Sequence, residues 1–152
     1  MELITGGYVF PHFQVMSNEL STPKILMCPQ EPDSWRVLAS TFCSQIPPGA
    51  TVTVPFTNDN NVSYFVGVDA VDTNPNAIMT GDHWLDLNGR TARRGLVSLT
   101  SKSRVRWVKS PPGHGDAGNI GLADGSVQQF SSTALQGLFT SSGTNLTRLA
   151  LP

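Results

Sequence analysis

The sequence predicts an α+β fold in which an antiparallel β-sheet carries a few short helices. Short runs of β-branched and aromatic residues recur between turns, and strands do not alternate regularly with long helices. The 14 glycines and 11 prolines among 152 residues favour frequent turns. Because the chain has no internal repeat and no low-complexity linker, we expect residues 1–152 to form a single domain.

The first part of the chain predicts two helices between short strands. A strand is expected at residues 2–5, and a second strand at residues 24–27. Apolar residues at spacings of three and four predict a helix over residues 9–20. A further helix is expected over residues 33–42, capped by its first or second residue. The apolar face of the first helix consists of Phe10, Phe13, Met16 and Leu20.

The second part of the chain is richer in strands. Residues 62–68 are expected to form a central strand, because nearly all of them favour β-structure. Strands are also predicted at residues 77–81 and 104–109, the latter with polar and apolar residues in alternation. Ser131 or Ser132 is expected to cap a helix. The apolar face of this helix is Leu135, Leu138 and Phe139, and an apolar tail follows with Leu146, Leu149 and Leu151.

A hairpin near the end of the chain is the clearest local signal. Two β-type segments, 119–123 and 126–130, flank the pair Asp124-Gly125. Asp-Gly is a favoured pair for a type I′ turn, in which both central residues have positive φ. We therefore expect a two-residue hairpin at this point.

The charge distribution offers one surface on which a partner could bind. Net charge is −1, and only 14% of residues are charged, so no nucleic-acid partner is expected. Seven of the ten basic residues nevertheless lie between Arg90 and Lys109. This stretch is either a partner surface or the solvated outer face of a strand. The candidate partner surface consists of Arg90, Arg93, Arg94, Arg104, Arg106 and Trp107.

Two groups of residues are candidates for binding a metal. Asp116, Asn119 and Asp124 could supply oxygen ligands to Ca²⁺ beside His114. The structural alternative is that Asp124 serves the turn and that His114 packs against the hairpin. A zinc site would draw on Asp82, His83 and His114, but their spacing matches no zinc signature.

No pattern of a catalytic nucleophile or a phosphate loop is present, so we do not expect an enzyme. The chain lacks a Gly-x-Ser-x-Gly elbow, and no sequence feature supports a thiol dyad of Cys28 or Cys43 with a histidine. The two cysteines are either bridged or free. A bridge would stabilise the fold by roughly 3 kcal/mol in the chain-entropy model.

Four stretches together resemble one family of secretion proteins. His114, nine further residues and Asp124-Gly125 form a motif similar to the C-terminal signature of prepilin-type, type II secretion pseudopilin-like proteins of Planctomycetes and Verrucomicrobia. Residues 12–29, 61–67 and 147–152 resemble the same family. The resemblance therefore spans nearly the whole chain.

The resemblance implies a structural subunit of a type II secretion or type IV pilus-like filament. Such proteins carry a leader that a prepilin peptidase removes, an apolar helix in the inner membrane, and a pilin-like α+β head in the periplasm. The leader and the helix are not visible here, so we expect a head trimmed from a longer protein, monomeric alone, with other pseudopilins as partners. Major pseudopilins hold Ca²⁺ in a C-terminal loop, so calcium is the one cofactor that the resemblance suggests.

A second hypothesis is an extracytoplasmic binding module. Trp84, Trp107 and the basic stretch would then form a groove for a secreted protein or a polysaccharide. A third hypothesis, a metal-dependent hydrolase, requires Asp82, His83 and His114 to lie together.

Overall fold

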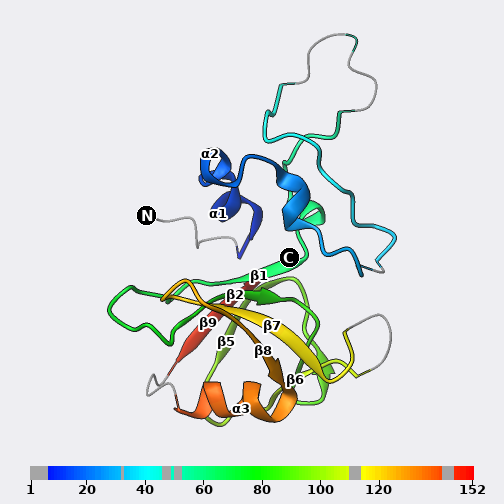
Figure 1. Cartoon of the computed structure of the whole chain (residues 1–152). Helices are drawn as coiled ribbons and strands as arrows, with labels where there is room; N and C mark the ends of the chain where they lie inside the picture. The colour runs from blue at the N-terminus through cyan, green and yellow to red at the C-terminus, as the bar shows by residue number, and fades with distance from the viewer. Residues whose placement is uncertain (1–6, 32, 46–48, 50–52, 110–113, 142–145) are drawn as a thin grey trace.

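A six-stranded antiparallel sheet forms the centre of the computed structural model (Figure 1). The structure describes residues 7–31, 33–45, 49, 53–109, 114–141 and 146–152. The strand order is β5-β9-β1-β2-β7-β8. The strands are β1 (Tyr64–Gly67), β2 (Ile78–Asp82), β5 (Gly95–Leu99), β7 (Ala117–Leu122), β8 (Val127–Ser131) and β9 (Thr147–Leu151). The expected central strand, β1, indeed lies inside the sheet.

A smaller sheet and one helix cover one face of the large sheet. The small sheet has the order β4-β3-β6 and comprises β3 (Leu85–Leu87), β4 (Arg90–Thr91) and β6 (Val105–Trp107). The helix is α3 (Ser132–Ser141), which begins where the sequence predicts it. Apolar side chains of both sheets and of α3 form the main core, among them Phe65, Leu85, Val105, Trp107, Ile120, Leu135, Phe139 and Leu149. The α+β class is confirmed.

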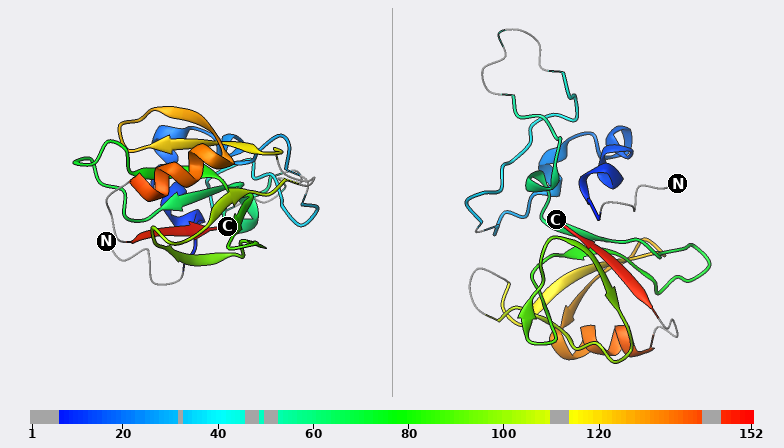
Figure 2. Two further views of the ribbon diagram at one scale, coloured as in Figure 1. Left: turned by 90° about the horizontal axis from the view of Figure 1, so that it is seen from below. Right: turned by 180° about the vertical axis from the view of Figure 1, so that it is seen from behind.

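The described residues between 7 and 62 form an N-terminal lobe on the opposite face of the large sheet, as Figures 1 and 2 show. Its regular elements are short: α1 (Phe10–Gln14), α2 (Ser17–Leu20) and the 3₁₀ helices η1 (Pro23–Leu26) and η2 (Asp59–Asn61). A second core of Val9, Phe13, Leu26, Ala39, Phe56, Val62 and Ala150 joins the lobe to the sheet, where Tyr64 and Val66 pack against it.

The N-terminal lobe differs from the sequence prediction in three places. The helix expected over 9–20 breaks into α1 and α2 at Met16, whose backbone leaves helical geometry (ψ 15°). Met16, which the apolar spacing places on the buried face, is 39% exposed. Instead of the strand expected at residues 24–27, the chain forms η1 (Pro23–Leu26), with Pro23 in its first turn, and only Met27 is extended. No helix forms over the described residues of 33–42. The strand expected at residues 2–5 lies outside the described residues.

The absent helix has a physical explanation in its backbone hydrogen bonds. The N–H of Val37 donates to the carbonyl of Asn60 (2.9 Å), and that of Ser40 donates to the carbonyl of Val54 (2.8 Å). Those donors would bond four residues back in a helix. Here they join distant parts of the lobe, so tertiary pairing overrides the apolar spacing.

The hairpin is confirmed, but its turn type is not the expected one. β7 and β8 pair antiparallel on either side of Asp124-Gly125. Only Gly125 has a positive φ (84°), and its N–H donates to the carbonyl of Leu122 (3.0 Å). This pattern is a type I turn followed by a left-handed glycine, the usual three-residue hairpin loop. Asp124 instead accepts a hydrogen bond from the N–H of Ser126 (2.9 Å).

None of the described helices has both the length and the apolar character needed to cross a bilayer.

Candidate functional site

Cys28, Asp82 and His114 meet where the N-terminal lobe touches the sheet. Cys28 follows η1, Asp82 ends β2, and His114 lies just before β7. The thiol Sγ of Cys28 is 3.3 Å from Nε2 of His114, and the same nitrogen is 3.9 Å from Oδ1 of Asp82. The motif histidine thus contacts two groups from segments that are far away in the sequence.

Asp82 is held in place from the sheet. Its side chain is 5% exposed, and its Oδ2 accepts hydrogen bonds from the backbone N–H (2.7 Å) and the side-chain amide (3.4 Å) of Asn119 on β7. Its other oxygen, Oδ1, faces His114, whose side chain is 30% exposed. A fixed buried carboxylate therefore lies beside a partly open imidazole.

This arrangement does not build a nucleophilic thiol. Burial raises the pKa of the Cys28 thiol, and the nearby carboxylates of Asp82 and Glu31 raise it further. Cys28 and Asp82 also approach the same ring nitrogen of His114. A relay needs the carboxylate on the second nitrogen of the base. The site offers ligand atoms rather than an activated nucleophile.

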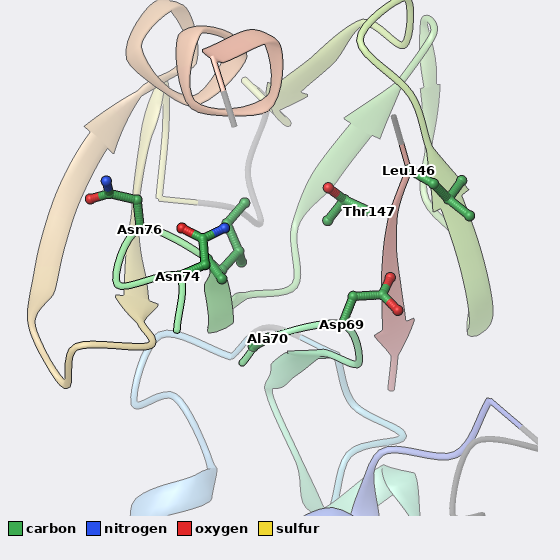
Figure 3. Close-up of a pocket in the computed structure, with 8 residues that line it drawn as sticks. Asp69, Ala70, Asn74, Asn76, Leu146 and Thr147 are labelled. Carbon is green, nitrogen blue, oxygen red and sulfur yellow. The ribbon is translucent and has the colours of Figure 1, made fainter. Parts of the chain in front are cut away.

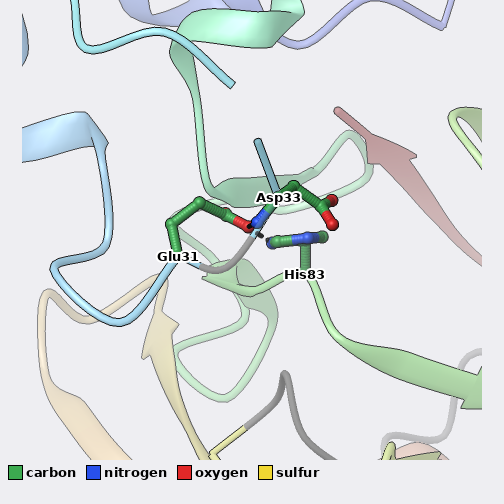
Figure 4. A group of neighbouring side chains, drawn as sticks. All are labelled: Glu31, Asp33 and His83. Carbon is green, nitrogen blue, oxygen red and sulfur yellow. Dashed lines mark hydrogen bonds and ion pairs between the residues drawn. The ribbon is translucent and has the colours of Figure 1, made fainter. Parts of the chain in front are cut away.

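A second cluster lies next to the first and consists of Glu31, Asp33 and His83 (Figure 4). One ligand atom from each of these residues lies within 4.8 Å of the others. His83 donates from Nδ1 to the backbone carbonyl of Ser63 (2.9 Å). Burial, and then the charge of Arg36, lower the pKa of His83 from 6.5 to about 4. The imidazole is therefore neutral at neutral pH.

Arg36 already supplies the positive charge that this second cluster needs. Its Nε lies 3.1 Å from Oε2 of Glu31, an ion pair whose angles are too poor for a hydrogen bond. The guanidinium also donates to the carbonyls of Asp59 (3.0 Å), Val62 and Pro152 (3.4 Å). Since the Arg36 side chain is only 1% exposed, the Glu31 carboxylate is its buried counter-charge. The second cluster is a structural centre that ties the lobe to the C-terminal strand.

The expected zinc trio is brought together only in part. His114 reaches Asp82, but His83 bonds to Ser63 and lies near Glu31 instead. Asp82 and His83 are consecutive at a strand end, where neighbouring side chains point to different sides. The hydrolase hypothesis required all three residues at one point, so the structure does not support it.

The expected calcium trio does not converge on one point. Asp116 accepts a hydrogen bond from the hydroxyl of Ser132, and Asn119 contacts Asp82. Asp124 lies in the turn at the other end of β7 from Asp116. A six-residue strand separates the two carboxylates by roughly 20 Å, far beyond the 2.3–2.6 Å reach of one Ca²⁺. The three residues are used by the hairpin and its neighbours.

Both cysteines are free thiols in the structure, so the bridged alternative is not formed. Cys28 lies against His114, as described above. Cys43 is exposed and donates from its thiol to the carbonyl of Gln45 (3.1 Å). The two thiols have separate partners.

The basic stretch is exposed, but one member of the expected partner surface is not. Trp107 is 3% exposed, and its indole N–H donates to the carbonyl of Phe130 (2.7 Å), so it belongs to the core. The reason is the alternation of β6, which points Arg106 outward and Trp107 inward. The arginines of that surface, Arg90, Arg93, Arg94, Arg104 and Arg106, are all exposed.

Part of this stretch borders a hollow of about 480 Å³ beside the first turn of α3. Its cationic members are Lys102, Arg104, Arg106 and Lys109. One acid, Asp116, faces them, with its Oδ2 3.9 Å from Nζ of Lys109. The hollow is therefore positively charged.

Another hollow, between the β1–β2 connection and the start of β9, is too small for a substrate (Figure 3). Asp69, Asn74, Asn76 and Leu146 are among the residues that line it. It holds about 40 Å³, which is room for a few water molecules.

Sequence reasoning did not find two of these features. Glu31 and Arg36 belong to no motif, and they are five positions apart in a segment whose described residues form no helix. The contact between Cys28 and His114 joins residues 86 positions apart. The sequence indicates the two residues only separately, Cys28 as one of two thiols and His114 as the start of the motif.

Comparison with models of protein families, with curated proteins and with solved structures finds no match.

Proposed function

We propose that the chain is the periplasmic head of a pseudopilin, a structural subunit of a type II secretion or type IV pilus-like filament. The observation that carries the proposal is the segment from His114 to Gly125. It resembles the family signature, and it builds β7 and the hairpin turn of an antiparallel sheet. The resemblance of three further stretches supports the same family.

The architecture suits a head that is attached through its N-terminal end. Gly7 lies against the edge strand β5, so close that a Cβ there would be 2.5 Å from the backbone nitrogen of Leu96. The first described residue of the chain therefore lies beside an edge strand of the large sheet. As a filament subunit, the head has a role in assembly.

Processing of the full-length protein tests this proposal. The gene should encode, ahead of this chain, a short basic leader and an apolar helix of about 20 residues. In a strain that lacks prepilin peptidase, a tagged full-length protein should accumulate as the longer precursor, and restoring the peptidase should restore the shorter form. An unchanged size, with no apolar helix upstream, would refute the proposal.

A second candidate function is a module that binds a polyanion, and the basic hollow beside α3 favours it. Four cations around one hollow would attract a sulfated or carboxylated polysaccharide, and the affinity would fall with added salt. Binding to a carboxylated polysaccharide should weaken in the double variant Arg104→Ala/Arg106→Ala and persist in Arg93→Ala. Equal binding by both variants would exclude the hollow as the binding surface.

A further inference from the structure

We propose that Cys28, Asp82 and His114 form a binding site for a divalent transition metal with the ligand preference of zinc. This site is independent of the pseudopilin proposal. It uses one ligand from the N-terminal lobe, one from the end of β2, and one from the segment before β7.

The three side chains are of the types that zinc selects. Thiolate sulfur, imidazole nitrogen and carboxylate oxygen are its usual ligands, at roughly 2.0–2.3 Å from the ion. Tetrahedral geometry then separates two ligand atoms by roughly 3.3–3.7 Å. Nε2 of His114 is 3.3 Å from Sγ of Cys28 and 3.9 Å from Oδ1 of Asp82. The first spacing is that of two ligands on one ion, and the second is slightly longer. The three ligand atoms do not all lie within 4.8 Å of one another, so the side chains of Cys28 and Asp82 have to approach each other when an ion binds.

The surroundings of Asp82 are those of an oriented metal ligand. Asn119 fixes Oδ2 with two hydrogen bonds, while Oδ1 is left facing the imidazole. Partners of this kind orient the ligands in metal sites. The Asp82 side chain is only 5% exposed, so its charge has lost most of its hydration. A cation beside the carboxylate would compensate for that loss.

The partial exposure of His114 leaves a way in and room for a fourth ligand. Its side chain is 30% exposed, whereas that of Asp82 is 5% exposed. Three protein ligands with water in the fourth position complete a zinc coordination sphere. The thiolate is the ligand form of cysteine, so binding releases the Cys28 proton to solvent.

The neighbouring cluster of Glu31, Asp33 and His83 is the weaker candidate, although its ligand atoms lie closer together. The guanidinium of Arg36 lies 3.1 Å from Oε2 of Glu31 and occupies the place of a cation. A metal there would bring two positive charges together at a buried point. Among the residues that the structure describes, Asp82 forms no ion pair or hydrogen bond with a lysine or an arginine.

Binding would crosslink the lobe to the sheet. Cys28 belongs to the N-terminal lobe, and the other two ligands belong to the β2–β7 region. A metal that binds only the folded state raises stability by mass action. We therefore expect the melting temperature of chelator-treated protein to rise when Zn²⁺ is added.

Titration of the reduced, chelator-treated protein with Co²⁺ tests the site. Cobalt in a zinc site with a cysteine ligand shows a thiolate-to-metal charge-transfer band, and we expect one equivalent to bind with this band. Cys28→Ser should abolish the band. His114→Ala and Asp82→Asn should weaken binding by more than about 100-fold, since the loss of mere supporting partners already costs 10–100-fold. Far-ultraviolet circular dichroism of each metal-free variant checks its fold.

Two matched variants keep the test decisive. Cys43→Ser removes the other free thiol, and Asp33→Asn alters the neighbouring cluster; both should bind Co²⁺ like the parent protein. Absence of the band in the parent protein would overturn the proposal, as would a band that survives Cys28→Ser. Loss of binding in Asp33→Asn together with normal binding in His114→Ala would place the metal in the other cluster and equally overturn it.

Discussion

Different interactions stabilise the two halves of the molecule, the sheet half and the N-terminal lobe. The sheet half contains strand ladders and a core of aliphatic and aromatic side chains from both sheets and α3. The N-terminal lobe has helices of only three to five residues. There, buried polar side chains bind the backbone: Asp59 accepts from the N–H groups of Val9 (2.9 Å) and Phe10 (2.8 Å), and Arg36 donates to three carbonyls.

This difference decides which substitutions each half tolerates. An apolar core responds mainly to changes of volume and shape. A polar centre responds to the loss of one partner, because the other partner then stays buried and unpaired at a cost of about 1–3 kcal/mol for each group. Steric change should therefore damage the sheet half, and loss of a polar group should damage the lobe.

The largest effect is expected from Gly67→Ala in β1. A Cβ at this position would lie 1.9 Å from the carbonyl oxygen of Ile78 on the neighbouring strand, so the backbones of β1 and β2 would have to separate. Overpacking against side chains costs about 1–3 kcal/mol, and a clash with backbone should cost more. Chemical denaturation should show a loss of more than about 3 kcal/mol.

Gly137→Ala is the matched control for this prediction. Gly137 lies within α3, and nothing lies within 4 Å of a Cβ placed there. Alanine is favoured over glycine in a helix by about 0.5–1 kcal/mol, so this variant should be slightly more stable than the parent protein. If both substitutions changed the stability equally, the close packing of β1 against β2 would not be what makes the sheet half sensitive to added volume.

The next effect is expected from Asp59→Ala in the lobe. The substitution leaves the N–H groups of Val9 and Phe10 without their acceptor, which should cost about 3 kcal/mol in all. Hydrogen exchange should become faster in α1 and stay slow in β7. Asp59→Asn keeps an accepting oxygen and should lose less, and Asp72→Ala, at an exposed acid, should change little. Uniformly faster exchange in both halves would contradict a division of the molecule into two differently stabilised parts.

The same division explains how much of the fold the sequence could predict. The β7–β8 hairpin and α3 depend on neighbours in sequence, on a turn pair and a serine cap, and the prediction found both. The range 62–68, which the β-branched and aromatic residues predict as a strand, contains the observed β1 (Tyr64–Gly67). In the lobe, Val37 and Ser40 form backbone bonds with residues 23 and 14 positions away, which no local pattern encodes.

The candidate site likewise depends on contacts between residues that are distant in sequence, which local patterns do not predict. His114 was singled out because it begins a motif, but its contacts with Cys28 and Asp82 span 86 and 32 positions. The turn type was wrong because the pair Asp-Gly also suits a three-residue loop in which only the glycine has positive φ. Trp107 is a different kind of error: the alternation along residues 104–109 already groups it with Val105 on the apolar face, whereas the expected partner surface includes it because of its arginine neighbours in sequence.

A smaller effect is expected when the lobe is acidified. His83 has a pKa of about 4 in the folded protein and 6.5 when unfolded, so the unfolded state binds the proton first. The stability that this histidine contributes is complete above pH 6.5 and is lost as the pH falls towards about 4. The shift corresponds to at most about 3 kcal/mol, and the 12% exposure of the side chain reduces it to roughly 2 kcal/mol.

Denaturation at a series of pH values in the presence of chelator measures this loss. His83→Asn retains a donor for the carbonyl of Ser63 and cannot titrate, so its stability should fall less between pH 6.5 and 4 than that of the parent protein. The difference between the two profiles is the readout, because carboxylates and His12 titrate in both proteins. Parallel profiles would mean that His83 is not held neutral by the lobe.

The smallest effect is expected from Asp69→Asn, a polar change in the sheet half. Asp69 pairs with Arg148 of β9, whose Nε lies 3.0 Å from its Oδ1, and the backbone N–H of Arg148 donates to Oδ2 (2.8 Å). The hydrogen bonds from Arg148 lower the pKa of Asp69. Both side chains are about one-third exposed, 36% for Arg148 and 32% for Asp69, so solvent screens the pair. Asparagine can still accept from the backbone N–H.

Asp69→Asn should therefore cost about 1 kcal/mol or less in chemical denaturation, and added salt should narrow the difference from the parent protein. The comparison with Asp59→Ala is the informative one, since both acids accept backbone N–H groups and differ in burial. A loss as large as that of Asp59→Ala would mean that a polar link, and not the strand ladder, holds β9 to the β1–β2 connection. The sheet half would then depend on buried polar partners just as the lobe does.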